Sequence, residues 1–220
     1  GEYTLPDRVR IIAASNRTED RAGAHRVISP ILNRCIHLDL EVSEQEWQTW
    51  AIGAAIDPAV RSFIAFRPGL LSAPVPTDGS RAWPTPRAWE AVSDAMGAVG
   101  ASQDVMAGIV GPGPAAEFVG FAEMAGKLPD VDALLKNPDT AKIPSGEPSV
   151  LYALSGVLVE AIRKDAKKMG ALATCAARLP AGFAVLTYRD AAAVRPEMVT
   201  TPAGKDWLKA NQDELRAARS

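Results

Sequence analysis

Three polar side chains in this sequence are of types that can bind a phosphate group. Asn16 follows a short aliphatic run, Arg34 stands at the end of a short helix-forming stretch, and Arg87 directly follows a proline that can open a helix. A neutral amide can hydrogen-bond water or a phosphate oxygen without adding charge repulsion. A guanidinium is permanently charged and binds phosphate through a fixed fork. Such groups suit phosphoryl transfer, which depends mainly on positioning and on neutralising the charge of the γ-phosphate.

Each of the three residues also has a commoner explanation. An asparagine after a strand usually takes part in a turn. An arginine near a helix end is usually solvated or complements the helix dipole. Arg87 fits this explanation less well than Arg34, because the start of a helix repels cations. The order of the three residues and the elements around them therefore matter more than any one of them.

Two short strands are predicted to position Asn16 and Arg34. Residues 9–15 are mostly aliphatic and predict a strand buried in a parallel sheet. Ser29 and the proline after it predict the start of a short helix, and residues 35–40 alternate apolar and polar, which predicts a second strand. Two such strands cannot bury their faces alone. We therefore expect the other strands of this sheet to be missing from the sequence.

From residue 43 onward the pattern becomes helical, so the expected fold class is mainly α. A capping box at residues 43–46 and Asp-Pro and Thr-Pro pairs at residues 57 and 85 predict helix starts, with an irregular proline-rich connection at residues 68–86. Residues 150–162 follow a helical stripe without exception. Further helices are predicted over residues 183–194 and 202–217, and a loop over residues 127–147.

Taken in order, three short motifs resemble the second half of a AAA+ ATPase module, especially that of the MoxR-like branch. They are IIAASN, which ends at Asn16, SPILNRCIHLDL, which contains Arg34, and TPRAWEAVS, which contains Arg87. The resemblance covers roughly residues 2–99. It implies a remnant of a parallel α/β AAA+ core in residues 1–42, followed by an all-helical lid in residues 43–100. Residues 101–220 would form a helical C-terminal extension.

The resemblance implies one role for each of the three residues. Asn16 would be sensor 1 and Arg34 the arginine finger, both catalytic, and Arg34 would act on the nucleotide of a neighbouring subunit in a homo-oligomeric ring. Arg87 would be sensor 2 and contact the ATP of its own subunit. ATP and Mg²⁺ are the implied cofactors of the parent ATPase, which would remodel or mature protein partners as a chaperone does. In this branch such partners often carry a von Willebrand factor A domain.

The phosphate-binding loop of such ATPases does not occur in the 220 residues. No G-x-x-x-x-G-K-[ST] is present, and the glycines that begin at Gly111 lack the lysine and follow a predicted helix rather than a strand. The hydrophobic strand ending in paired acidic residues that precedes sensor 1 in the family is absent too. We therefore expect the chain to be a fragment, shortened by design or by proteolysis, that binds no ATP or Mg²⁺ and is catalytically inactive alone.

The composition of the sequence argues against nucleic acid, membranes and metal ions as partners. The formal net charge of −2 leaves no electrostatic footprint for nucleic acid. No apolar run is long enough to span a membrane and no leader pattern is present, which predicts a soluble cytoplasmic protein without membrane contacts. Cys35 and Cys175 each lie in an apolar segment and are predicted to be small buried hydrophobes. With only His25 and His37 as further soft ligands, no metal site is predicted.

Two other interpretations of the sequence remain open. In the first, the helices form a non-catalytic scaffold or interaction module, and the arginines are ordinary surface charges. In the second, the chain is a clamp-loader-like subunit, whose helical extension would form a collar around DNA. The net charge of −2 disfavours the second interpretation.

Overall fold

A computed structural model of the chain describes residues 5–6, 8–15, 29–125, 128, 130–144 and 146–212. The chain forms two compact units, Gly1–Glu41 and Val42–Ser220. Within the described ranges every regular element is a helix. The prediction of a mainly α chain is therefore confirmed.

The first unit contains one short helix, α1 (Ser29–Leu32), among its described residues. A turn follows it, in which the backbone N–H of Arg34 donates to the carbonyl oxygen of Ile31 at 3.0 Å. Nε2 of His37 lies 2.9 Å from the carbonyl oxygen of Leu32. These local bonds satisfy carbonyl groups that the end of a helix leaves without partners.

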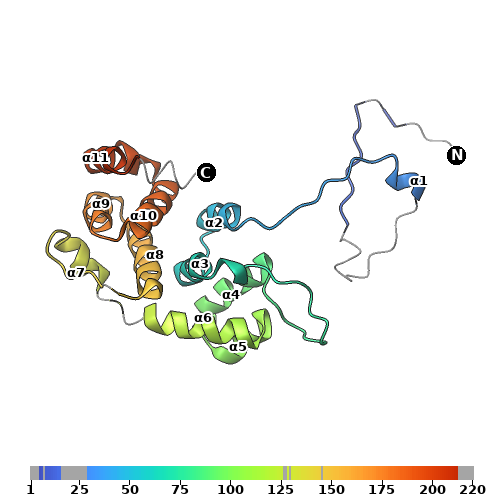
Figure 1. The fold of residues 1–220 in the computed structure, drawn as a ribbon, viewed down its shortest axis with the longest axis horizontal. Coiled ribbons are helices and arrows are strands. Elements are labelled where there is room, and N and C mark those ends of the chain that lie inside the picture. The colour runs from blue at the N-terminus through green and yellow to red at the C-terminus, as the bar shows by residue number, and fades with distance from the viewer. Residues whose placement is uncertain are drawn as a thin grey trace. The chain divides into compact units, whose positions relative to one another are not determined.

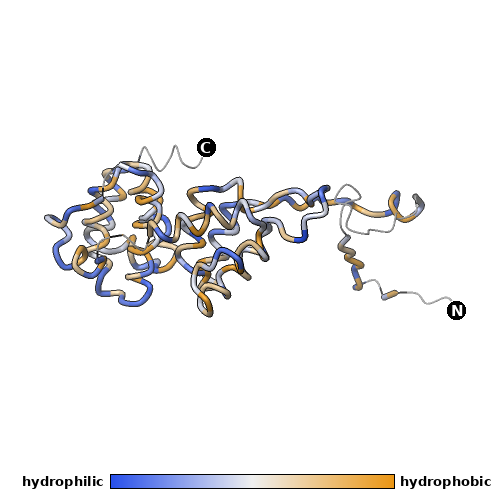
Figure 2. The backbone as a smooth tube through the Cα atoms, turned by 90° about the horizontal axis from the view of Figure 1, so that it is seen from below, coloured by the Kyte–Doolittle hydropathy of each residue, from blue (hydrophilic) through white to orange (hydrophobic). Residues whose placement is uncertain are grey.

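The two segments predicted as strands, residues 9–15 and 35–40, contain no strand. Their aliphatic side chains are exposed instead, Ile12 to 93% and Ile36 to 91%, and Figure 2 colours parts of the described chain of this unit as hydrophobic. A strand needs a neighbouring backbone with which to form hydrogen bonds. The described part of the unit offers no such neighbour to either segment, so the prediction of two strands is wrong for this structure.

The second unit is a set of packed helices joined by turns and by irregular connections, of which residues 71–85 are the longest in the described ranges (Figure 1). No helix in the described ranges is both long enough and apolar enough to cross a bilayer. The α-helices are α2 (Glu44–Gly53), α3 (Pro58–Phe66), α4 (Pro86–Val99), α5 (Gln103–Val110), α6 (Pro112–Ala125), α7 (Val131–Lys136), α8 (Pro148–Lys164), α9 (Met169–Ala177), α10 (Ala181–Val194) and α11 (Pro202–Ala210). The 3-10 helices are η2 (Pro68–Leu70), η3 (Ala166–Lys168) and η4 (Pro196–Thr200).

Most predicted helix starts are confirmed. Ser43, Asp57 and Thr85 open α2, α3 and α4, each by accepting a hydrogen bond from a backbone N–H in the first turn of its helix. Helix α8 includes the whole stripe predicted over residues 150–162. Helix α11 begins where expected, and the predicted end of that helix at residue 217 lies outside the described residues.

Helix α7 corrects the prediction of a loop over residues 127–147. Asp130 caps this helix by accepting a hydrogen bond from the backbone N–H of Asp132 at 2.9 Å, and Leu134 and Leu135 are buried. A helix of 6 residues is too short for its period to stand out among the neighbouring prolines.

The first core of the second unit is built around aromatic rings from three helices. The ring centroids of Phe63 in α3, Trp89 in α4 and Phe118 in α6 lie 5.3 to 5.7 Å apart. The indole N–H of Trp89 donates to the carbonyl oxygen of Leu70 at 2.7 Å, so its polar atom is satisfied inside the core. This core runs across residue 100 without a break, and its other buried members are Trp47, Ala51, Ile56, Val60, Ile64, Leu71, Val92, Met106, Val110, Ala115, Phe121 and Ala153.

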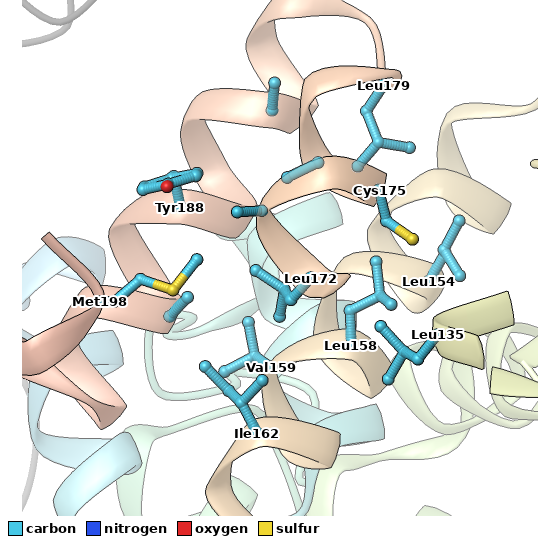
Figure 3. Close-up of a cluster of buried hydrophobic side chains, with 14 of the residues drawn as sticks. Leu135, Leu154, Leu158, Val159, Ile162, Leu172, Cys175, Leu179, Tyr188 and Met198 are labelled. Atoms are coloured by element: carbon cyan, nitrogen blue, oxygen red, sulfur yellow. The ribbon is translucent and has the colours of Figure 1, made fainter. Parts of the chain in front are cut away.

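The second core lies where α8, α9 and α10 meet (Figure 3). Leu158 of α8 and Leu172 of α9 are fully buried in it. The ring of Tyr188 in α10 stacks on Trp207 of α11, with centroids 3.9 Å apart and planes 3° from parallel. This contact attaches the last described helix to the rest of the unit.

The two cysteines lie in different environments. Cys175 is buried in the second core, as predicted, and burial raises the pKa of its thiol to about 11. Cys35 is exposed, so the prediction that it is a buried hydrophobe is wrong. Its segment was expected to be a strand inside a sheet, and without strand partners nothing among the described residues covers it.

Helix α8 contributes to both cores and packs closely against α3. Leu154 of α8 belongs to the second core and Ala153 to the first. A Cβ added at Gly156 would overlap the hydroxyl of Ser62 and lie 3.3 Å from the carbonyl oxygen of Pro58. Glycine at this position therefore allows the two helices their close approach.

We expect Gly156→Ala to lower the free energy of unfolding by about 1–3 kcal/mol, because the added methyl group forces α3 and α8 to repack. Gly97→Ala is the matched control, because a Cβ at that helical position meets no atom within 4 Å. It should leave stability unchanged or raise it, since alanine favours a helix more than glycine does. Urea unfolding followed by circular dichroism measures both. Equal stability of the Gly156→Ala and parent chains would contradict the close α3–α8 contact.

Candidate functional site

The structure describes two of the three residues predicted to handle phosphate, Arg34 and Arg87, each within its own unit. Asn16 lies outside the described residues. Arg34 is exposed and lies in the turn after α1, in the first unit, whereas Arg87 belongs to the second unit. The structure therefore defines the surroundings of Arg34 and Arg87 separately, and the roles of all three residues stay predictions.

Arg87 is the second residue of α4, and its side chain is exposed. Thr85 caps this helix by accepting a hydrogen bond from the backbone N–H of Ala88 at 3.0 Å. Trp89 is fully buried in the first core and fixes how α4 is rotated about its own axis. Because each residue turns the helix by about 100°, Arg87 lies roughly 200° around the axis from Trp89 and points away from that core.

Arg87 has no carboxylate partner among the described residues. Glu90, three residues further on, could reach it on the same face of the helix, but no ion pair within the described ranges involves Arg87. The first turn of a helix also presents backbone N–H groups that carry partial positive charge. A cation beside them makes this helix start suited to an anion.

A second polar group, not anticipated from the sequence, is buried between α3, α8 and α10. Arg61 of α3 is only 5% exposed, and one of its terminal nitrogens lies 3.9 Å from Oδ2 of Asp190 in α10. The side chain of Gln48 donates to the carbonyl oxygen of Arg61 at 2.9 Å. The hydroxyl oxygens of Thr187 and Ser155 lie 2.8 Å apart between α10 and α8. Polar side chains from four helices therefore meet inside an otherwise apolar interface.

The electrostatics of this group centre on Arg61. Burial lowers the pKa of its guanidinium from the ordinary value, and the negative charges of Asp190 and Glu160 oppose that change. Nε of Arg61 has no hydrogen-bond partner among the described residues. A buried cation with an unsatisfied donor costs free energy. The contact with Asp190, at 3.9 Å, is too long to offset that cost as a short hydrogen-bonded pair would.

Two neighbouring cavities adjoin the buried group. The smaller has a volume of about 10 Å³, enough for one water molecule, and Arg61 and Asp190 are among its lining residues. The larger has a volume of about 300 Å³, near the lower limit for small-molecule sites. Tyr152 and Leu186 line both cavities, so the two lie side by side.

The sequence around Arg61 contains a signal for its burial. Arg61 lies in α3 between the buried residues Val60 and Phe63, in a helix whose other side chains are mostly apolar. A charged residue in so apolar a helix is a candidate for burial, and buried arginines usually have a charged partner. Asp190 carries no such signal, because an adjacent Arg–Asp pair is ordinary on a solvated helix face.

No group of three or more His, Cys, Asp or Glu side chains in the described part of the chain is arranged to hold a metal ion. Comparison with protein-family models, with curated protein sequences and with solved structures finds no match. Function must therefore be inferred from the residues themselves.

We expect Asp190→Ala to destabilise the fold by about 3 kcal/mol, because it leaves Arg61 buried without its nearest carboxylate. Arg61→Met, which replaces the cation by an apolar side chain of similar length, should cost much less or be stabilising. Asp132→Ala removes an exposed ion pair with Lys168 and serves as a control that should change little. Thermal unfolding compares the three variants. A smaller loss for Asp190→Ala than for Arg61→Met would contradict this view of the pair.

Proposed function

We propose that this chain forms the sensor and lid part of a ring-forming AAA+ ATPase of the MoxR-like branch. In this proposal residues 1–42 belong to the α/β core, residues 43–100 form the lid, and the phosphate-binding loop is supplied by residues outside this sequence. ATP and Mg²⁺ bind only where that loop is present. The assembly is a cytoplasmic homo-oligomer that remodels protein partners, among them proteins with a von Willebrand factor A domain.

The observation that carries this proposal is the environment of Arg87. It is an exposed arginine at the start of a helix, without a carboxylate partner among the described residues, on a helix anchored by Trp89. An arginine with a purely structural role would be stabilised more by a nearby carboxylate or by the C-terminus of a helix. A γ-phosphate would supply the negative charge that this position lacks. The exposed aliphatic side chains of residues 11, 12, 36, 38 and 40 also support it, since a sheet would bury them.

One observation favours the alternative of a non-catalytic helical module. The first core continues across residue 100, so the helices assigned to the lid share their apolar interior with α5 and α6. A lid that moves with nucleotide state would have to move together with those helices. In this alternative Arg34 and Arg87 are solvated surface charges, and the chain serves as a rigid surface for a protein partner.

We expect Arg87→Ala to lower ATP turnover on the order of a hundredfold in a polypeptide that contains both this sequence and a phosphate-binding loop, because one charge-stabilising contact to the phosphates is lost. Arg87→Lys should recover part of the loss, since it keeps the charge but not the fork. Arg81→Ala is the control, because Arg81 is also exposed and lies in the preceding irregular connection. Steady-state phosphate release measures all three. Equal turnover in all three variants would favour the helical module.

A further inference from the structure

Two guanidinium groups share one carboxylate at the junction of α3 and α10. Oδ1 of Asp190 accepts from Nε of Arg189 at 3.0 Å, and Oδ2 of the same carboxylate lies 3.9 Å from Arg61. Arg61 is 5% exposed, and its Nε has no partner among the described residues. The carboxylate of Asp190 therefore pairs with two cations, and its contact with the buried one, Arg61, is the weaker of the two.

The surrounding charges do not correct this imbalance. Glu160 is near enough to act on Arg61, but its oxygens accept from Arg163 at 2.7 and 2.6 Å. Three guanidiniums, those of Arg61, Arg163 and Arg189, thus face two carboxylates, and the ammonium of Lys164 lies 3.6 Å from the second of these, Glu160. A further anion at this junction would reduce the local excess of positive charge around the buried Arg61.

The larger cavity lies directly beside these charges, is partly open to solvent and has mostly apolar walls. Its volume is about 300 Å³, and its lining residues are Tyr152, Gly182, Phe183, Val185, Leu186 and Arg189. The rings of Tyr152 and Phe183 meet edge to face with centroids 5.0 Å apart, and both side chains are partly exposed. Partly exposed aromatic walls with one cation at the edge are typical of a small-ligand site.

We propose that this cavity binds a carboxylate carried on a small apolar body. The apolar body lies against Tyr152, Phe183 and Leu186. The ligand's carboxylate accepts two charge-assisted hydrogen bonds from the guanidinium of Arg189. Asp190, released from Arg189, can then form a shorter contact with Arg61. Each of the two guanidiniums is paired with a carboxylate of its own. The volume limits the apolar body to about the size of a phenylalkyl group or one large side chain.

Such a carboxylate has two sources, a free organic acid or the C-terminal residue of a polypeptide. The probes are therefore 4-phenylbutyrate and a tetrapeptide that ends in phenylalanine with a free carboxylate. Their neutral counterparts are 4-phenylbutanamide and the same tetrapeptide as its C-terminal amide. Binding to the full 220-residue chain is followed by ligand-observed NMR and by the amide shifts of α8 and α10. We expect a Kd on the order of a millimolar for a ligand of this size.

At least one of the two acids should bind, at least tenfold more tightly than its own amide. Arg189→Gln should abolish that preference, and because Arg189 is 45% exposed this variant should fold normally. Arg67→Gln, at an arginine of nearly equal exposure that pairs with Glu117, should leave the preference intact. Binding of the free acid alone or of the peptide acid alone identifies the source, and either result supports the proposal. No binding of either acid, equal binding of acid and amide, or an unchanged preference in Arg189→Gln would overturn it.

Discussion

The close packing of α3 against α8 at Gly156 is the contact on which the second unit depends. A side chain at this position would overlap Ser62, so the two helices can approach only because one of them has glycine there. Helix α8 contributes Ala153 to the first core and Leu154 to the second. The α3–α8 contact therefore connects the two cores, and any change in it alters both.

The same contact explains why a charged residue is buried. Ser62 packs against α8, and its neighbour Arg61 lines a small cavity together with Ser155 of α8 and Asp190 of α10. Asp190 is then the nearest carboxylate, and it is already engaged by Arg189. The burial of Arg61 without a close carboxylate of its own therefore lowers the stability of the fold. Proteins commonly accept such a cost where charge is used for binding, and the apolar cavity next to this junction is the place where a ligand could use it.

The sequence predicts the helical body well and the polar sites poorly, for physical reasons. Caps such as Ser43 and the apolar stripe of α8 are local signals, and both predictions are confirmed. The strands of residues 9–15 and 35–40 are not formed, because strand pairing depends on backbone that those segments do not contain. The Arg61–Asp190 pair joins residues far apart in the chain, so no local pattern reveals it. The exposed helix start of Arg87 could be predicted from Pro86 and Trp89 alone, and its role as sensor 2 stays a proposal.

The proposal that this chain belongs to a ring-forming ATPase is tested most directly by asking whether Arg34 acts on the nucleotide of a neighbouring subunit. In a longer polypeptide that includes the phosphate-binding loop, Arg34→Ala should lower turnover on the order of a thousandfold while ATP affinity is kept, because a finger acts mainly in the transition state. Mixing this variant with a subunit whose phosphate-binding loop is inactivated should restore activity at interfaces where an intact finger meets an intact loop. Full activity of the Arg34→Ala variant, or no recovery in mixed rings whose assembly has been demonstrated, would contradict the proposed function.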